Sequence, residues 1–135
     1  MEKTKKWKKI WVNGCFDILH AGHIELLKFA KSQGDVLYVG IDSDQRVKQL
    51  KGESRPINNL HSRMAVMSAI KYVNVVECFH SDEHLEQLLY EIKPDMMVIG
   101  AEYREKRIIG AEYCEKITFF EKYKDYSSTN AIEKL

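Results

Sequence analysis

The chain of 135 residues carries 21 Lys and Arg against 20 Asp and Glu, so its formal net charge is +1 at pH 7. Hydrophobic residues make up 44% of it and charged residues 30%, which is typical of one globular domain with a single core. This balance argues against a nucleic-acid-binding protein and against attraction to an anionic membrane, both of which need a strong positive field. No apolar run approaches the roughly 18 residues that a transmembrane helix requires.

The start of the chain and its cysteines bear on the domain boundary and on localisation. Residues 1–9 are basic and no apolar segment follows them, so we predict a solvated arm rather than a secretory signal, with the domain spanning residues 10–135. A nucleic-acid-binding tail is the alternative for this arm. The cysteines are odd in number and far apart (Cys15, Cys78 and Cys114), which indicates free thiols in a reducing, cytoplasmic protein.

Short apolar runs alternate with helical patterns along the whole chain. The expected strands span residues 10–14, 35–41, 73–79, 96–100 and 117–120. The expected helices span residues 22–32, 44–50, 60–72 and 82–92, one more could begin at Gly110, and Ser127 or Ser128 would cap a last one. This alternation predicts a single Rossmann-like α/β domain, a five-stranded parallel sheet with helices on both faces.

Local signals refine this outline. Ser43 or Asp44 is expected to cap the second helix, and Ser81 or Asp82 the fourth. Residues 51–59 form the most polar and least regular stretch and are expected to be a loop. Ligands of such sheets bind at the carboxyl ends of the strands, so this edge is the place to look for a site.

The first strand leads into a segment suited to phosphate. Residues 13–23 read Asn-Gly-Cys-Phe-Asp-Ile-Leu-His-Ala-Gly-His, and a helix follows. His20 and His23 therefore lie at a helix start, where free N–H groups and the helix dipole attract anions, and Gly22 allows a ligand to come close. Helix capping or burial is one alternative for the imidazoles. Metal binding is another, although zinc needs three or four ligands and only Cys15 is near.

Residues 14–23 resemble the signature of the cytidylyltransferase-like nucleotidyltransferases. The segment is most similar to the adenylyltransferase domain of bacterial ADP-heptose synthases, with the glycerol-3-phosphate cytidylyltransferases second. The resemblance covers about residues 8–135 and implies transfer of a nucleotidyl group from ATP to a heptose 1-phosphate, with release of pyrophosphate. CTP and glycerol 3-phosphate are the second choice, and a non-catalytic nucleotide-binding regulator is the third. A nicotinamide-binding domain is disfavoured, because no Gly-x-Gly-x-x-Gly follows the first strand.

Two later segments extend the resemblance. Residues 50–58 are similar to a Leu-Lys-Gly-Asp-Ser-Arg-Pro-Val-Asn segment of the heptose branch, whereas the cytidylyltransferase branch has a shorter loop. Residues 98–103 match its Val-Lys-Gly-Gly-Asp-Tyr segment, with departures at Ile99, Ala101 and Glu102. Lys71 instead matches an Arg of the glycerol-phosphate branch.

The residue patterns and the resemblance together assign roles to individual residues. His20, His23 and Lys51 are the catalytic candidates, with the imidazoles on the α-phosphate. The nucleotide pocket is expected to contain Gly14, Cys15, Phe16, Asp17, Gly22, Gly100, Ser127, Ser128 and Thr129. The candidates for contact with the acceptor phosphate are Lys48, Arg55, Arg63 and Lys71. For Lys51, Lys48 and Arg55, solvated surface charge is the alternative.

Four further expectations remain to be tested. Asp17 would either bind Mg²⁺ or hydrogen-bond backbone in the turn, and Arg63 would make either a structural ion pair or a phosphate contact. No dedicated metal site is expected, because Mg²⁺ arrives on the nucleoside triphosphate. Relatives are commonly dimers, so a homodimer is expected, with the triphosphate and a sugar or polyol phosphate as the other partners.

Overall fold

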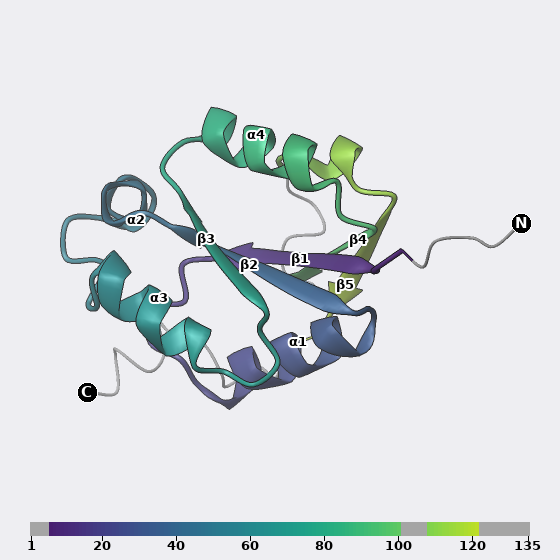
Figure 1. The fold of residues 1–135 in the computed structure, drawn as a ribbon. Coiled ribbons are helices and arrows are strands. Elements are labelled where there is room, and N and C mark those ends of the chain that lie inside the picture. The colour runs from purple at the N-terminus through teal and green to yellow at the C-terminus, as the bar shows by residue number, and fades with distance from the viewer. Residues whose placement is uncertain (1–5, 101–107, 122–135) are drawn as a thin grey trace, which may run out of the picture.

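The structure, a computed structural model, describes residues 6–100 and 108–121. Successive strands are separated by one or two helices, as Figure 1 shows. In chain order the elements are β1 (Lys9–Gly14), α1 (Ala21–Ser32), β2 (Val36–Asp42), α2 (Asp44–Lys51), α3 (Leu60–Ser68), β3 (Val75–Phe79), α4 (Asp82–Ile92), β4 (Met96–Gly100), the short 3-10 helix η2 (Ala111–Tyr113) and β5 (Lys116–Phe120).

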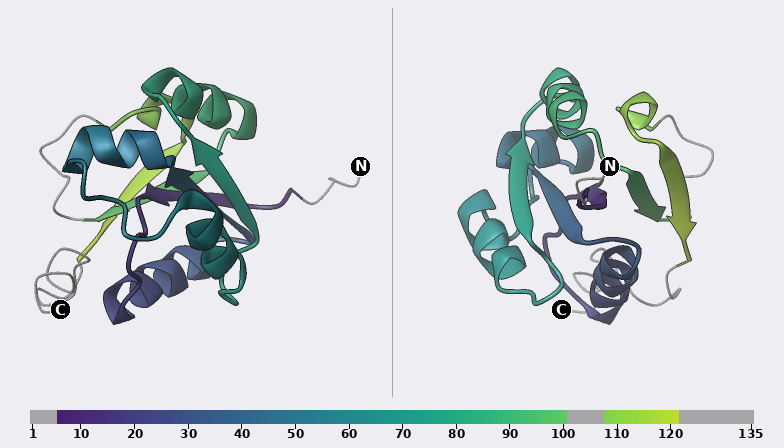
Figure 2. Two further views of the ribbon diagram at one scale, coloured as in Figure 1. Left: turned by 90° about the vertical axis from the view of Figure 1, so that its left-hand side faces the viewer. Right: turned by 45° about the vertical axis from the view of Figure 1, so that its right-hand side comes forward.

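The five strands form one parallel sheet in the order β3-β2-β1-β4-β5. Helices α1 and α3 cover one face, and α4 with η2 covers the other (Figure 2). Because side chains alternate along a strand, β1 supplies both layers: Ile10 and Val12 pack with α1 and α3, whereas Trp11 packs with α4. Strands covered on both faces are apolar almost throughout, which explains the runs in the sequence. The predicted fold class is confirmed.

Several element boundaries differ from the prediction. The helix expected to reach residue 72 ends at Ser68, because tight turns follow in which Ile70 donates to the Met67 carbonyl and Val73 to the Ile70 carbonyl. Asn74 then exchanges hydrogen bonds with Leu37, so β3 begins only at residue 75. The helix expected from residue 110 is a single 3-10 turn. The expected last helix lies outside the described residues.

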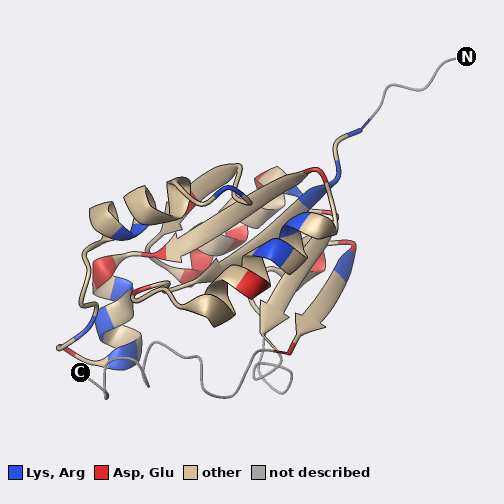
Figure 3. Cartoon of the chain, turned by 90° about the horizontal axis from the view of Figure 1, so that it is seen from below, with Lys and Arg blue, Asp and Glu red and all other residues tan. Residues whose placement is uncertain are grey.

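Helix caps settle two alternatives. Ser43 accepts a hydrogen bond from the Arg46 N–H as the N-cap of α2, and Ser81 caps α4 in the same way. Lys51 is the last residue of α2 rather than part of the loop that follows. Lys and Arg recur along this helix, which reads DQRVKQLK (Figure 3).

The two edges of the sheet differ in character. Lys8 enters at the amino edge, where its backbone N–H donates to Asp35 and its carbonyl accepts from residues 35 and 36. A shallow cavity of about 340 Å³ lies there, lined by residues 6–8, 95–96 and 115–116. The turn that contains His20 follows β1 and therefore lies at the opposite, carboxyl edge. None of the helices in the described part of the chain has the length and apolarity that a membrane span needs.

Candidate functional site

The two histidines cap helix α1 with one ring nitrogen each. His20 is the N-cap residue, and its Nδ1 accepts a hydrogen bond from the Gly22 N–H at 3.1 Å. The Nδ1 of His23 accepts from the His20 N–H at 3.2 Å, which completes a capping box. The ring centroids lie 3.9 Å apart with an interplanar angle of 32°. The capping alternative therefore describes the Nδ1 atoms correctly.

These bonds assign the tautomer of each ring. A neutral imidazole carries one N–H, and a nitrogen that accepts a backbone hydrogen bond cannot carry it. The proton of each neutral ring therefore resides on Nε2, so that each Nε2–H is a donor. Both donors belong to residues at the positive end of the α1 dipole, which is suited to stabilising charge on a phosphate oxygen.

A tight turn joins β1 to these histidines. Phe16 adopts a left-handed backbone conformation (φ 49°), and its ring is buried with an edge contact to His23 at a centroid distance of 5.7 Å. A Cβ at Gly14 would lie only 3.2 Å from the Phe16 ring, so glycine permits this close approach. The turn holds the second imidazole through an aromatic contact as well as through the capping box.

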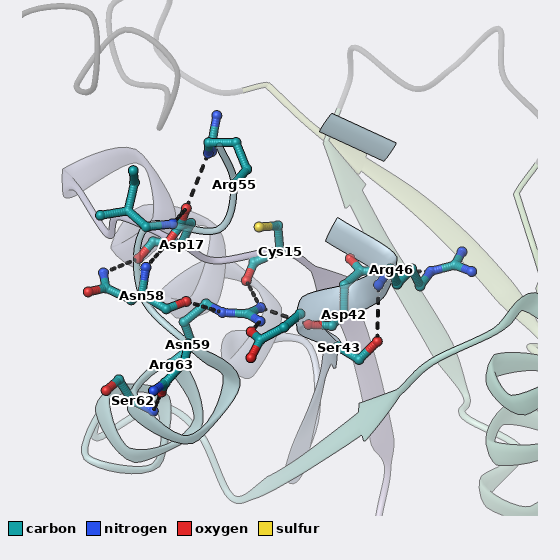
Figure 4. A network of polar contacts seen from close by, with 12 residues as sticks. Cys15, Asp17, Asp42, Ser43, Arg46, Arg55, Asn58, Asn59, Ser62 and Arg63 are labelled. Carbon is teal, nitrogen blue, oxygen red and sulfur yellow. Dashed lines mark hydrogen bonds and ion pairs between the residues drawn. The ribbon is translucent and has the colours of Figure 1, made fainter. Parts of the chain in front are cut away.

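Asp17 fastens this turn to the loop after α2. Its Oδ2 accepts hydrogen bonds from the Ile57 N–H at 2.7 Å and from Arg55 Nε at 3.2 Å, and its Oδ1 accepts from the Asn58 N–H at 2.8 Å (Figure 4). The Asn58 side chain also donates to the Asp17 carbonyl at 2.8 Å. The structure shows hydrogen bonding to backbone, but in the loop after α2 rather than in the turn itself.

Arg63, on helix α3, donates hydrogen bonds to three segments at the same edge of the sheet. Its side chain is fully buried and its Nη1 donates to the carbonyls of Cys15 and Asp42 at 2.9 and 2.7 Å. Its Nε donates to the Asn58 carbonyl at 2.9 Å, and its Nη2 forms an ion pair with Asp44 at 2.6 Å (Figure 4). Of the two alternatives for this residue, the structure shows the structural ion pair.

Two other predicted cations lie close to the turn. Burial raises the pKa of the Cys15 thiol, and the positive charges of Lys51 and Arg63 oppose this shift, so Lys51 lies within electrostatic reach of the turn. Arg55 is nine-tenths buried beside Asp17, and its Nη2 has no hydrogen-bond partner among the described residues. Lys48 is exposed one turn earlier on α2.

Of the remaining predicted residues, the two glycines lie at the carboxyl edge of the sheet and Lys71 does not. Gly22 lies in the first turn of α1 and Gly100 ends β4 at the carboxyl edge. Lys71 follows α3 and precedes β3, which places it at the amino edge, where its ammonium lies 5.2 Å from the centroid of the Tyr72 ring. Ser127, Ser128 and Thr129 lie outside the described residues.

The structure also adds a cluster that the sequence analysis did not single out. Burial raises the pKa of Asp42 at the end of β2, and its 2.7 Å ion pair with Arg46 opposes this shift. Arg46 also pairs with Asp82 at 2.7 Å and stacks over the Phe79 ring. The i, i+4 spacing of the Asp-Arg pair could have indicated the first contact, whereas the second joins separate helices.

Comparisons with known proteins agree with this arrangement. The profile of the family described as Cytidylyltransferase-like matches residues 11–134. The bifunctional protein HldE of Campylobacter jejuni subsp. doylei is 43% identical over 133 residues, which make up 98% of this chain and 29% of that protein. HldE of Helicobacter hepaticus is 39% identical over 135 residues, 100% of this chain and 28% of that protein. The chain thus spans well under half the length of these relatives.

A solved structure is similar over nearly its whole length. The lipopolysaccharide core biosynthesis protein from Thermoplasma volcanium superposes with a TM-score of 0.72 and is 31% identical in sequence. The match covers 87% of this chain and 99% of that protein's chain. The fold is therefore shared with a protein of similar size.

Proposed function

The chain belongs to the cytidylyltransferase-like family, and from this premise we propose that it is a nucleotidyltransferase that acts on ATP and a heptose 1-phosphate. A phosphate oxygen of the sugar phosphate attacks the α-phosphorus of ATP, the bond between the α- and β-phosphates breaks, and pyrophosphate leaves. ADP-heptose is the other product. The similarity to the HldE proteins over nearly the whole chain supports the choice of substrates.

One observation supports the catalytic part of this proposal more than any other. Both Nδ1 atoms accept backbone hydrogen bonds, so both Nε2–H groups of His20 and His23 are donors at the start of α1. We assign them to the α-phosphate, where negative charge rearranges in the transition state. Donors fixed in advance need no reorganisation when the reaction occurs. No covalent intermediate with the protein is required.

The remaining candidates surround this pair. Lys51 would bind phosphate of either substrate, with Lys48 and Arg55 as further cations for the acceptor. Arg63 would act through the backbone carbonyls that it holds, and Lys71 fits this scheme least because it lies at the amino edge. We propose a nucleotide pocket formed by Gly14, Cys15, Phe16, Asp17, Gly22, Gly100, Ser127, Ser128 and Thr129.

Mg²⁺ would enter as part of the nucleotide substrate. Within residues 6–100 and 108–121, no group of three or more His, Cys, Asp or Glu is placed to hold a metal ion. The oxygens of a triphosphate are hard ligands that suit Mg²⁺, which keeps several waters when bound. The metal would supply charge neutralisation to the leaving pyrophosphate. We further propose a cytoplasmic homodimer, which sedimentation at several concentrations would test.

A single panel of reactions tests the function. ATP, CTP, GTP and UTP are each mixed with heptose 1-phosphate, glycerol 3-phosphate and other sugar phosphates, and pyrophosphate release is followed. The proposal expects the fastest release with ATP and heptose 1-phosphate. Faster release with CTP and glycerol 3-phosphate would favour the cytidylyltransferase alternative. Nucleotide binding without release for every acceptor would favour a regulator.

A further inference from the structure

Arg55 stands out among the buried arginines of the described residues. Arg63 donates to four acceptors, and Arg46 pairs with two carboxylates and stacks on an aromatic ring. The side chain of Arg55 is 10% exposed, about as buried as that of Arg46 at 13%. Among the buried arginine nitrogens of the described residues, Nη2 of Arg55 is the one without a hydrogen-bond partner.

Such a group has a cost that a structural role does not offset. A buried donor of a charged group that has lost water and gained no partner destabilises the fold. The guanidinium could satisfy its ion pair with Asp17 through Nε alone. The fold therefore provides no hydrogen-bond acceptor for Nη2 among the described residues. A charged N–H donor of this kind suits an anionic oxygen.

Asp17 holds this guanidinium in place. The carboxylate accepts three hydrogen bonds from the loop, of which two come from backbone N–H groups and one from Arg55. These bonds fix the loop backbone and the guanidinium against the turn that leads into His20 and His23. A side chain fixed in this way loses little conformational freedom when a ligand binds.

We infer that Arg55 binds a phosphate oxygen of a substrate through Nη2 and that Asp17 is the positioning residue that orients it. The inference rests on the proposed function, since it places this phosphate beside the α1 start where we assign the nucleotide. The positive charge of Lys51 acts electrostatically on Cys15 of the same turn. Either the triphosphate or the sugar phosphate can supply the oxygen, and the experiment distinguishes the two.

The test measures binding rather than turnover, so it stands apart from the panel above. The dissociation constants of α,β-methylene-ATP, and of heptose 1-phosphate in its presence, are measured by calorimetry for the wild type and for Arg55→Lys. We expect a loss of at least ~10-fold for one of the two ligands, because Lys lacks the planar fork that bridges a carboxylate and a phosphate. The weakened ligand identifies the source of the oxygen.

Arg46→Lys is the matched control, since it changes a similarly buried, ion-paired arginine outside the proposed site. Its affinities should remain within ~2-fold of the wild type. Circular dichroism and a denaturation midpoint establish that each variant is folded. Unchanged affinity for both ligands in folded Arg55→Lys would overturn the inference, as would a wild type that binds neither ligand.

The positioning role of Asp17 has its own readout. Asp17→Asn keeps an oxygen acceptor but removes the charge that holds the guanidinium. If Asp17 acts through Arg55, the double variant binds the phosphate no more weakly than Arg55→Lys alone, because the two changes remove one interaction. Additive losses would show that Asp17 is merely structural. If Arg55→Lys does not fold, Asp17→Asn alone decides, and unaltered binding by it would count against the pair.

Discussion

Each of the two histidines serves the fold and the proposed chemistry with different atoms. The Nδ1 atoms satisfy N–H groups that the start of α1 would otherwise leave without partners. The Nε2–H groups then have a fixed direction, because the ring cannot rotate without breaking the cap. The capping box and the catalytic assignment are therefore not competing explanations of the same residues.

Replacing His20 separates the two tasks. Asn is a good N-cap residue, so His20→Asn should remain within ~0.5 kcal/mol of the wild type in free energy of unfolding, whereas His20→Ala should lose about 1 kcal/mol. Both variants lose the Nε2–H donor, and turnover should fall by about 10² in each, with little change in nucleotide affinity. Urea denaturation and pyrophosphate release measure the two effects. Wild-type turnover in a folded Asn variant would refute the catalytic role.

At this scale the sequence was informative about position and silent about partners. The His-x-Gly-His spacing after an apolar strand predicted two imidazoles at a helix start, which the structure confirms. It could not choose between the roles of Asp17 and Arg63. Asp17 contacts Arg55, which lies 38 residues away along the chain, and Arg63 contacts Cys15, which lies 48 residues away. No local spacing in the sequence reveals such pairs.

Lys51, the last residue of helix α2, adds a positive charge near the turn. Lys51→Ala should raise the KM for the sugar phosphate or lower turnover, because an ammonium near the turn disappears. Lys51→Arg keeps the charge and should retain more activity than the Ala variant. Lys28→Ala, an exposed change on α1, is the control. Unaltered kinetics in Lys51→Ala would assign the side chain to solvated surface.

The connection between η2 and β5 contains a thiol that should resist ionisation. Burial raises the pKa of Cys114 from 9.0 to about 11, and the nearby negative charge of Glu112 adds to the shift. The folded state therefore holds this proton more tightly than the unfolded state, so the contribution of Cys114 to stability falls as the pH rises from 9.0 to about 11.

Alkylation measures this shift directly. Iodoacetamide reacts with the thiolate, so the rate at Cys114, followed by mass spectrometry of the native protein, should rise with a midpoint near 11 rather than 9.0. The alkylation rate of Cys114 in the urea-unfolded protein, measured in the same way, provides the reference for the unfolded state. A native midpoint at the reference value would contradict the prediction.

Element boundaries show where sequence patterns lose their power. The apolar positions of residues 60–72 continue at helical spacing, yet α3 stops at Ser68. Tight turns follow, and beyond them the Asn74 side chain accepts hydrogen bonds from Leu37 and Lys31 of distant elements. Such a competition between local pattern and tertiary contact is invisible before the fold is known.

At the scale of the molecule, the alternation of apolar runs and helical patterns was enough to predict a parallel sheet covered on both faces. The strand order was not predictable from it, because alternation does not say on which side of β1 each new strand joins. The turn after β1 was correctly expected at the carboxyl edge of the sheet, and the structure adds the polar loop to it. Asp17 joins the turn to the loop, and Arg63 contacts the turn, the end of β2 and the loop at once.

Removing that side chain should therefore affect the whole fold. Arg63→Ala leaves Asp44 without its ion pair and three carbonyls without their donor, so we expect a loss of about 3–5 kcal/mol in free energy of unfolding. Urea denaturation measures it. The exposed neighbour His61→Ala should change stability by less than ~0.5 kcal/mol. A small loss in Arg63→Ala would mean that water replaces the guanidinium at this edge.

The opposite edges used by the entering chain and by the histidines have a practical consequence. Lys8 joins the sheet at the amino edge, whereas the imidazoles follow the carboxyl end of β1. A sensor chip, bead or fluorescent label attached at the amino edge would thus lie away from the proposed nucleotide site. Immobilised protein should keep its solution affinity, which makes surface-based kinetics a practical format for this molecule.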